Sequence, residues 1–271
     1  MTQTDFEEIA YAKINLALHV RKRREDGYHE LETLFAFVDQ GDVLHVSTGD
    51  PDSLRVTGEF AEAAGSLEGN LAWRALKLDE RRLPLQLELK KRLPVAAGLG
   101  GGSADAGAVI RALYRFDGPR SRIKPAAIAA LGADVPACVE SRTCLGLGTG
   151  TELVPGPQDL AGTPVLLVNP RVPLSTGPVF KAWDGVDRGA LPQGSALEIA
   201  LSGRNDLEAP AISLCPNIGD VLTALRDTAP LLARMSGSGA TCFALYASEE
   251  ALNCAIASLP AAWWTMAGRL R

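Results

Sequence analysis

The sequence has little of what metal-binding and nucleic-acid-binding proteins need. Its 271 residues include three histidines and five cysteines, an odd number that contains no C-x-x-C pair. A structural zinc site is therefore not supported. Acidic residues outnumber basic residues by 32 to 27, so the formal net charge is −5. This charge gives no electrostatic basis for binding nucleic acid.

Long apolar runs are also missing. No run approaches the roughly 18–20 residues that span a bilayer, and the acidic start MTQTDFEEIA lacks the apolar core of a secretory signal. We therefore expect a cytoplasmic protein without a membrane or nucleic-acid partner. With 46% hydrophobic and 22% charged residues, the chain has the composition of a soluble globular protein. Its length allows one large or two ordinary domains, and a monomer and a homodimer are equally compatible with it.

The most informative stretch is PVAAGLGGGSADAG, at residues 94–107, where four of the five residues 98–102 are glycine. Glycine adopts positive φ without a Cβ penalty and lets backbone N–H groups come close to a ligand. Ser103 is a candidate N-cap, and Ala106, Ile110 and Leu113 follow at the spacing of a packed helix. A glycine loop that enters a helix presents unpaired N–H groups and a positive dipole end. We therefore expect an anion site, most often one for phosphate.

Three alternatives to this interpretation differ in their sequence requirements. A P-loop needs a lysine after the last glycine, but Gly102 is followed by Ser103, Ala104 and Asp105. The dinucleotide pattern G-x-G-x-x-G fails at its third glycine from either start, although Asp117 stands near its acidic position. A flexible linker is the third alternative, but linkers are seldom flanked by an apolar segment and a capped helix.

Hydrophobic periodicity predicts an α+β protein, because strands and helices alternate without a regular βαβ repeat. We place the domain boundary in the Pro-Gly-Pro segment at 155–157, which gives domains 1–157 and 158–271. The segment from Gly185 to Gly203 has little pattern and is predicted to be a loop. Strands are expected at 8–20, 31–38, 42–46, 54–57, 85–90, 143–147, 164–168, 242–246 and 263–266. Helices are expected after Ser103 and at 71–83 (capped by Asn70), 125–131, 176–183, 218–225 and 249–259 (capped by Ser248).

Two polar features stand out within this pattern. Lys13 and Asn15 share one face of the first strand, opposite its apolar face, where polar residues are usually just solvated. Val135 precedes Pro136, and the residue before a proline disfavours the helical region, so we expect Asp134 on a connection between elements. An ordinary helix-end turn residue is the alternative interpretation of Asp134.

Five short strings, in the same order along the chain, resemble the motifs of the GHMP kinases. This superfamily is named for galactokinase, homoserine kinase, mevalonate kinase and phosphomevalonate kinase. Within it, the chain is most similar to the members that phosphorylate the 2-hydroxyl of 4-diphosphocytidyl-2-C-methyl-D-erythritol in the non-mevalonate isoprenoid pathway. The strings are AKINL at 12–16, DGYHEL at 26–31, GLGGGS at 98–103, GADVP at 132–136 and NDLE at 205–208.

The resemblance implies two α+β domains, an N-terminal nucleotide-binding domain and a C-terminal ferredoxin-like domain, with the active site in the cleft between them. It implies an ATP-dependent small-molecule kinase that uses ATP with Mg²⁺, because phosphoryl transfer needs a cradle for the polyphosphate, charge compensation and a base at the hydroxyl. The cradle would consist of Pro94, Val95, Ala96, Ala97, Gly98, Leu99, Gly100, Gly101, Gly102, Ser103 and Ala104.

The family's catalytic residues match two positions of this chain. Asp134 matches the aspartate that accepts the proton of the substrate hydroxyl, and Lys13 matches the lysine that pairs with it. A nearby lysine stabilises an ionised carboxylate and lowers its pKa, and it also offsets charge that develops in the transition state.

Substrate binding would involve Asn15 and the aromatic residues that distinguish this group of kinases. Tyr28 and His29 would hold the cytidine, with His29 at the cytosine edge, and Phe180 would complete a base sandwich with Tyr28. Their ordinary alternatives are a turn histidine and a core aromatic. The third motif corresponds to Ser236, Gly237, Ser238 and Gly239, which would close the site beside the triphosphate; a tight glycine hairpin would have the same sequence.

Two departures from the family leave parts of this interpretation open. Asp105 stands near a helix N-terminus, where it favours the helix dipole but opposes a phosphate unless its side chain points away. Gly102 stands about where other members carry a metal-contacting serine, so the metal ligands are not assigned. The rival interpretations are a homoserine or mevalonate kinase, an inactive regulatory protein on the same scaffold and, more remotely, a dehydrogenase.

Overall fold

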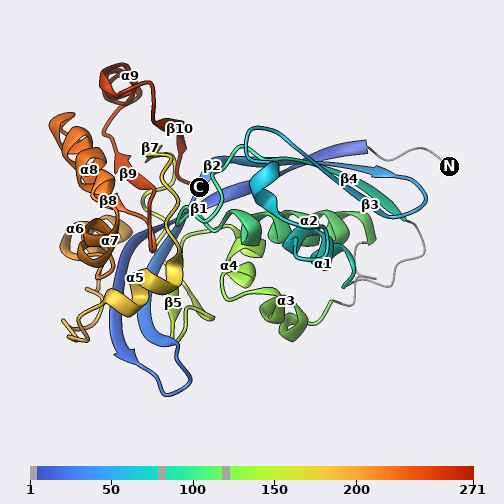
Figure 1. Cartoon of the computed structure of the whole chain (residues 1–271), viewed down its shortest axis with the longest axis horizontal. Helices are drawn as coiled ribbons and strands as arrows, with labels where there is room; N and C mark the ends of the chain where they lie inside the picture. Colours follow the sequence, from blue (N-terminus) through green and yellow to red (C-terminus); the bar gives the residue numbers. More distant parts are fainter. Residues whose placement is uncertain (1–4, 79–83, 118–122) are drawn as a thin grey trace. The chain divides into compact units, whose positions relative to one another are not determined.

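The computed structural model describes residues 5–78, 84–117 and 123–271, and they form two compact units (Figure 1). The first unit takes the residues up to Ala12, then Gln40–Val95 and Gly100–Ser141. The second takes Lys13–Asp39, Ala96–Leu99 and Arg142–Arg271. Each unit draws on several segments, so the predicted boundary at 155–157 stays a prediction. The predicted end of the helix at 71–83 lies outside the described residues, as does most of the chain break at 119–124, which was predicted after the helix that follows Ser103.

Two long strands, β1 (Asp5–Arg23) and β2 (His29–Thr48), contribute residues to both units. In the first unit β4 lies between β3 and β2, parallel to β3 and antiparallel to β2, with Val43 opposite Lys90. Leu85, Leu87 and Leu89 are buried along β4 while the residues between them are exposed, which confirms the predicted alternation. The other elements of this unit are β3 (Ser53–Thr57), β4 (Leu85–Lys90), the 3₁₀ turn η1 (Glu62–Ala64), α1 (Leu71–Leu76), α2 (Gly101–Asp117), α3 (Pro125–Leu131) and α4 (Val135–Glu140).

Strand β2 is one continuous element where the sequence predicted two strands. The interruption was expected at Asp39–Gly41, which is polar and contains a glycine. The strand continues because Asp42 is fully buried against Lys91, and because Gly41 lies so close to β1 that a Cβ there would be 1.9 Å from the carbonyl oxygen of Ala10. Burial of Gly41 and Asp42 therefore takes the place of the expected turn.

Helix α2 begins earlier than predicted, so the expectation that Ser103 is its N-cap was wrong. The helix starts at Gly101, and the carbonyl oxygen of Gly100 accepts a hydrogen bond from the N–H of Ala104 at 2.8 Å. Ser103 is therefore a residue of the first turn. The cap predicted for α1 is confirmed, because Asn70 Oδ1 accepts from the N–H of Ala72 at 2.9 Å.

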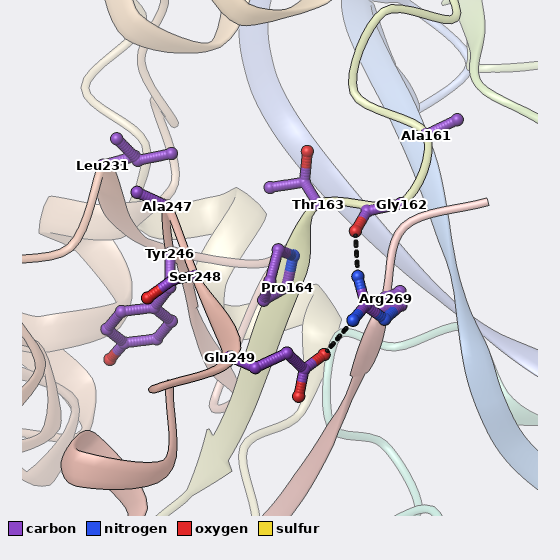
Figure 2. A pocket seen from close by; sticks show the side chains of 10 residues that line it. All are labelled: Ala161, Gly162, Thr163, Pro164, Leu231, Tyr246, Ala247, Ser248, Glu249 and Arg269. Atoms are coloured by element: carbon purple, nitrogen blue, oxygen red, sulfur yellow. Dashed lines mark hydrogen bonds and ion pairs between the residues drawn. The ribbon is translucent and has the colours of Figure 1, made fainter. Parts of the chain in front are cut away.

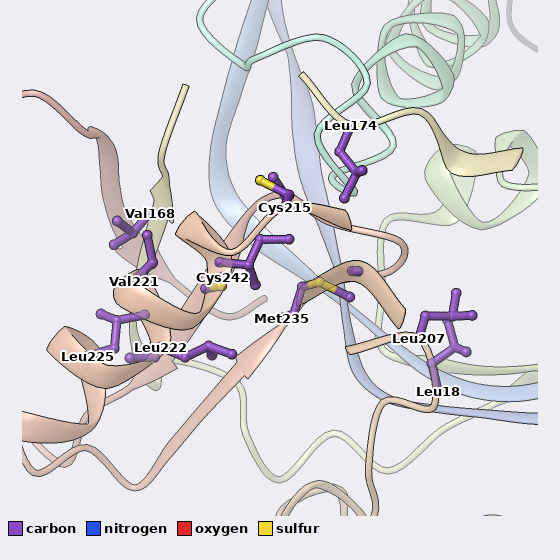
Figure 3. Close-up of a cluster of buried hydrophobic side chains, with 14 of the residues drawn as sticks. Leu18, Val168, Leu174, Leu207, Cys215, Val221, Leu222, Leu225, Met235 and Cys242 are labelled. Carbon is purple, nitrogen blue, oxygen red and sulfur yellow. The ribbon is translucent and has the colours of Figure 1, made fainter. Parts of the chain in front are cut away.

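The second unit contains an antiparallel sheet of order β10-β7-β9-β8 and the smaller pairing β2-β5-β6. Helices α8 and α9 pack against the larger sheet. Figure 3 shows the core, in which Val221, Leu222 and Leu225 of α8 lie near Met235 and Cys242 of the sheet. Its elements are β5 (Cys144–Leu147), β6 (Glu152–Pro155), β7 (Pro164–Asn169), α5 (Thr176–Ala182), α6 (Ala196–Ser202), α7 (Glu208–Leu214), α8 (Asn217–Asp227), β8 (Leu232–Met235), β9 (Cys242–Leu245), α9 (Glu249–Ser258) and β10 (Trp264–Arg269).

The segment predicted as a loop, from Gly185 to Gly203, contains helix α6. A capping box starts this helix, since Ser195 Oγ accepts from the N–H of Glu198 and the Glu198 carboxylate accepts from the N–H of Ser195. Asp159, distant in sequence, accepts a further hydrogen bond from the N–H of Ala196 at 2.7 Å. The box is readable as S-x-x-E, whereas the contribution of Asp159 is tertiary. Strands β6 and β8 and helix α7 were also not predicted.

His19 is a buried histidine that joins β1 to the chain before α7. Its Nδ1 is 3.0 Å from the carbonyl oxygen of Gly189, and its Nε2 accepts from the N–H of Arg204 at 3.2 Å. Burial is the main cause that lowers the pKa of His19, while the Gly189 carbonyl acts in the opposite direction. The folded protein therefore holds this imidazole neutral.

We expect this histidine to make the free energy of unfolding decrease as the pH is lowered. Because the folded pKa of His19 lies below its unfolded value near 6.5, the unfolded chain binds the proton more readily. The contribution is complete above about pH 6.5 and is lost as the pH falls towards the folded pKa, with a slope of at most about 1.4 kcal/mol per pH unit. Urea unfolding at pH 7.5, 6.5 and 5.5 should show a steeper loss for the wild type than for His19→Gln. Parallel curves would contradict this role, since His29 is present in both proteins.

Candidate active site

Three sequence-distant segments converge inside the second unit: β1 around Lys13 and Asn15, the loop residues 96–99, and the β8–β9 connection at 236–241. The N–H of Lys13 donates to the carbonyl oxygen of Leu99 at 3.0 Å. The N–H of Asn15 donates to Ser236 Oγ at 3.2 Å, and Ser236 Oγ donates to the carbonyl oxygen of Gly98 at 2.8 Å. The N–H of Thr241 donates to the carbonyl oxygen of Ala97 at 3.1 Å. Two of the five recognised strings, AKINL and GLGGGS, are thus joined to each other and to the third-motif loop by direct hydrogen bonds.

Glycine is required at position 98 for two independent reasons. Its φ is +76°, in the region that side chains disfavour, and a Cβ there would lie 2.3 Å from the carbonyl oxygen of Ser236. The two glycine-rich segments therefore approach each other backbone to backbone. The segment 236–239 is a hairpin connection, since Ser236 N–H donates to the Thr241 carbonyl, and it also contacts the first loop.

The rest of the glycine loop, from Gly100 onward, belongs to the first unit and forms the start of α2. The first N–H groups of this 17-residue helix have no partner within the helix, which suits an anion. Asp105 does not oppose that use, because its Oδ2 lies 2.7 Å from Lys91 Nζ in a buried cluster with Asp42. Burial raises the pKa of Asp105 to about 8, against the opposing effect of the Lys91 ammonium.

Lys13 is held in place by a directed chain of hydrogen bonds. Its Nζ donates to Asn15 Oδ1 at 3.0 Å, Asn15 Nδ2 donates to Thr33 Oγ1 at 2.7 Å, and Thr33 Oγ1 donates to the Ala17 carbonyl at 2.7 Å. The ammonium also lies 4.7 Å from the ring centre of Phe35. Lys13 is 4% exposed and Asn15 2% exposed, so the alternative that they are merely solvated is wrong.

Asp134 occupies the N-cap position of α4, in the first unit. It stands on the connection between α3 and α4, as predicted, and its carbonyl oxygen accepts from the N–H of Cys138 at 3.0 Å. The sequence did not predict α4 itself. The pairing of Asp134 with Lys13 stays a prediction.

A second cluster in the same unit as Lys13 joins the β1–β2 hairpin to α5. His29 is 8% exposed, and its ring centre lies 4.9 Å from that of Phe180 and 5.7 Å from that of Trp183, the latter edge-on at 81°. Arg23 Nε lies 3.4 Å from His29 Nε2. Burial, and then the charge of Arg23, lower the pKa of His29, so this ring is neutral at pH 7.

The structure brings together some of the predicted substrate residues and leaves others separate. Phe180 contacts His29, whereas Tyr28, the residue before His29, is 67% exposed. The sandwich of a base between Tyr28 and Phe180 therefore stays a prediction. Trp183 is 3% exposed, and its Nε1 is buried without a hydrogen-bond partner among the residues that the structure describes.

Sequence reasoning assigned no role to several residues that position the site. Asn205 Nδ2 donates to the carbonyl oxygens of Met235 and Gly237, both at 2.8 Å, and so holds the third-motif loop. The string NDLE includes Asn205, but nothing in the sequence indicated that this residue contacts the third-motif loop. Ser238 Oγ is 3.0 Å from Thr176 Oγ1, which links the same loop to the start of α5. Thr33, Arg23 and Trp183 carry no motif that could have identified them.

A surface hollow of about 450 Å³ between α9, β7 and β10 is lined by none of the predicted site residues (Figure 2). Arg269 crosses it, with one nitrogen 2.6 Å from Glu249 Oε1 and another donating to the Gly162 carbonyl at 2.9 Å. Its charge is therefore already compensated within the hollow. Across residues 5–78, 84–117 and 123–271, no group of three His, Cys, Asp or Glu side chains is arranged to hold a metal ion, and no helix could cross a membrane.

Comparisons with known proteins all identify the same family of kinases. Residues 70–148 match the family described as GHMP kinases N terminal domain, and residues 191–263 match GHMP kinases C terminal. A 4-diphosphocytidyl-2-C-methyl-D-erythritol kinase of Novosphingobium aromaticivorans is 63% identical over 97% of this chain and 92% of its own length. The enzyme of that name from Paracoccus denitrificans is 46% identical over 97% and 96% of the two chains.

Solved structures give the same result at the level of the fold. A crystal structure of 4-(cytidine 5'-diphospho)-2C-methyl-D-erythritol kinase matches with a TM-score of 0.82 and 34% identity, over 98% of this chain and 99% of that one. A homoserine kinase from Cytophaga hutchinsonii matches with a TM-score of 0.71 and 19% identity, over 100% of this chain and 96% of that one, which shows a shared fold.

The contact between the two glycine segments can be tested by Gly98→Ala. We expect the free energy of unfolding to fall by about 2 kcal/mol or more, since a side chain at positive φ alone costs of order 1–3 kcal/mol and the Cβ would also overlap the Ser236 carbonyl. Gly102→Ala is the matched control for urea unfolding, because a Cβ there meets nothing nearer than Leu71 Cδ1 at 3.6 Å. If both variants unfold like the wild type, the close approach at Gly98 is wrong.

Proposed function

The chain belongs to the 4-diphosphocytidyl-2-C-methyl-D-erythritol kinases of the GHMP family, and from this membership we propose its reaction in detail. The enzyme transfers the terminal phosphoryl group of ATP to the 2-hydroxyl of 4-diphosphocytidyl-2-C-methyl-D-erythritol and yields the 2-phosphate and ADP. This is a step of the non-mevalonate route to isoprenoid precursors, and we place it in the cytoplasm. The fold is the two-domain α+β fold of the GHMP kinases.

One observation carries the proposal more than any other. Within the second unit, β1, the residues 96–99 and the third-motif loop are joined through Ser236 and the N–H of Lys13. These segments lie far apart in the sequence, and each carries one motif of the family. A lysine is costly to bury, so its burial among these segments favours a functional role over a merely structural one.

The residues 94–104 fit a polyphosphate. The backbone turns with positive φ at Ala96, Gly98 and Gly100, and the loop then enters the N-terminus of α2, whose first N–H groups have no partner within the helix. Asp105 is turned to Lys91, so no carboxylate from this turn repels an anion. ATP, when bound, supplies the phosphoryl group, and we propose that Mg²⁺ accompanies it mainly through phosphate and water ligands.

We propose Asp134 as the general base and Lys13 as the charge-compensating group. Asp134 accepts the proton of the 2-hydroxyl, which makes that oxygen a better nucleophile. Lys13 offsets the negative charge that develops at the reacting oxygens, and Asn15 and Thr33 fix the direction of its ammonium. A buried lysine held by hydrogen bonds needs little reorganisation during the reaction.

The cytidine is assigned to Tyr28, His29 and Phe180, with Asn15 near the acceptor. A neutral imidazole between β2 and α5 can donate one hydrogen bond to a base, and Tyr28 and Phe180 offer ring faces. Stacking of a base on an aromatic side chain typically contributes about 1–3 kcal/mol. Homoserine and mevalonate have no base that would use these rings.

The reaction is tested by release of ADP from ATP and Mg²⁺. We expect turnover with 4-diphosphocytidyl-2-C-methyl-D-erythritol and none with homoserine or mevalonate in parallel assays. Turnover with one of the other alcohols would keep the phosphoryl-transfer chemistry and exclude the cytidine pocket. Binding of ATP without turnover of any alcohol would favour a regulatory protein.

Replacement of the proposed base should affect turnover and leave ATP binding intact. Asp134→Asn removes the proton acceptor with little change of shape, and kcat should fall by about 10²–10⁴-fold while the KM for ATP stays within a factor of two of the wild-type value. Asp220→Asn, an exposed residue of α8, is the control that loses the same charge. Near-normal kcat in Asp134→Asn would remove Asp134 from the base role.

A further inference from the structure

Arg23, at the end of β1, makes three contacts that no sequence motif predicted. Its Nε lies 3.4 Å from His29 Nε2. Its Nη2 lies 3.5 Å from the carbonyl oxygen of Lys181 and 3.4 Å from that of Trp183. One guanidinium thus contacts both the histidine ring and the end of α5, which carries Phe180.

The chemistry of the two groups decides where the proton of His29 lies. A guanidinium has only donors, so the nitrogen that it contacts must offer a lone pair. The ring is neutral and carries a single N–H, because burial and the arginine charge both disfavour its protonation. The proton is therefore on Nδ1, and Nδ1 has no hydrogen-bond partner among the described residues.

The ring itself is restrained by its aromatic neighbours. Phe180 lies 4.9 Å away at a tilt of 41°, and Trp183 meets the ring edge-on at 5.7 Å. Arg23 also contacts the carbonyl oxygens of Lys181 and Trp183. The guanidinium, the histidine ring and its two aromatic neighbours are therefore packed together. The remaining choice is which ring nitrogen carries the hydrogen.

We propose that Arg23 is a positioning residue that holds His29 in its Nδ1–H form, and that this form makes the pocket prefer cytosine to uracil. The inference rests on the proposed cytidine site. Ring N3 of cytosine is an acceptor and pairs with an N–H donor, whereas N3 of uracil carries a hydrogen and opposes one. Without Arg23 the histidine is free to adopt the Nε2–H form, in which Nδ1 becomes an acceptor.

The test compares CDP and UDP binding by calorimetry in the wild type and in Arg23→Gln. The wild type should bind CDP more tightly than UDP, and the ratio of the two affinities should fall about tenfold in the variant, as expected for one hydrogen bond. The KM for ATP should not change. ¹⁵N spectra of the histidines, of which the chain has three, should show a non-protonated Nε2 for His29 in the wild type and a protonated one in Arg23→Gln. His29→Asn assigns the resonance.

Arg24→Gln is the matched control. It removes the same charge from the same hairpin, but the Arg24 guanidinium is paired with Asp26, at 3.0 Å, instead of with the ring. An equal loss of selectivity in both variants, an unchanged ratio in Arg23→Gln, or a protonated Nε2 in the wild type would each overturn the inference. A failure of the proposed function alone gives a different result. CDP selectivity and the tautomer change would then be observed, but the erythritol substrate would not be turned over.

Discussion

The arrangement of the second unit depends on a single hydroxyl group, that of Ser236. It is fully buried, accepts from the N–H of Asn15 and donates to the carbonyl oxygen of Gly98. A hydroxyl can do both at once, and the two backbone groups that it pairs would otherwise be buried without partners, at about 1–3 kcal/mol each. One side chain therefore contacts three segments at once, and the backbone hydrogen bonds of Lys13 and Thr241 join the same segments. Glycine at position 98 lets the two backbones come close enough for that hydroxyl to reach both backbone groups.

Buried polar groups of this unit are arranged as directed chains. Asn15 presents its oxygen to Lys13 and its amide nitrogen to Thr33, and the chain ends at a backbone carbonyl. Arg234 is 9% exposed and donates to the carbonyl oxygens of Leu16, Ala200 and Gly203. In each case, carbonyl or amide oxygens accept from a cation that would be costly to bury alone. The polar residues thereby fix β1 relative to the elements of its own unit.

Local patterns predicted much of the fold, and their failures have physical causes. The alternation in β4, the caps of α1 and α9 and the extent of α3 were readable because they depend on neighbours in sequence. The continuity of β2 was not, since it depends on an ion pair between Asp42 and Lys91, which are distant in sequence. Helix α6 had a readable capping box, but its start also depends on Asp159. At the site, motifs identified Lys13 and the glycine loops, whereas Arg23 and Trp183 are defined only by their contacts with His29.

The hydrogen bond between Asn15 and Ser236 joins residues 221 positions apart. During synthesis the amino-terminal strand is therefore made long before the loop that completes its surroundings. Until the ribosome has released the third motif, the polar face of β1 around Lys13 and Asn15 has no Ser236 to contact. Contacts between residues so far apart in sequence form late, because the entropic cost of closing the loop between them must be overcome first. An incomplete chain that ends before Ser236 thus holds the lysine without the geometry around it. The surroundings of β1 are therefore completed only after a further 221 residues have been made.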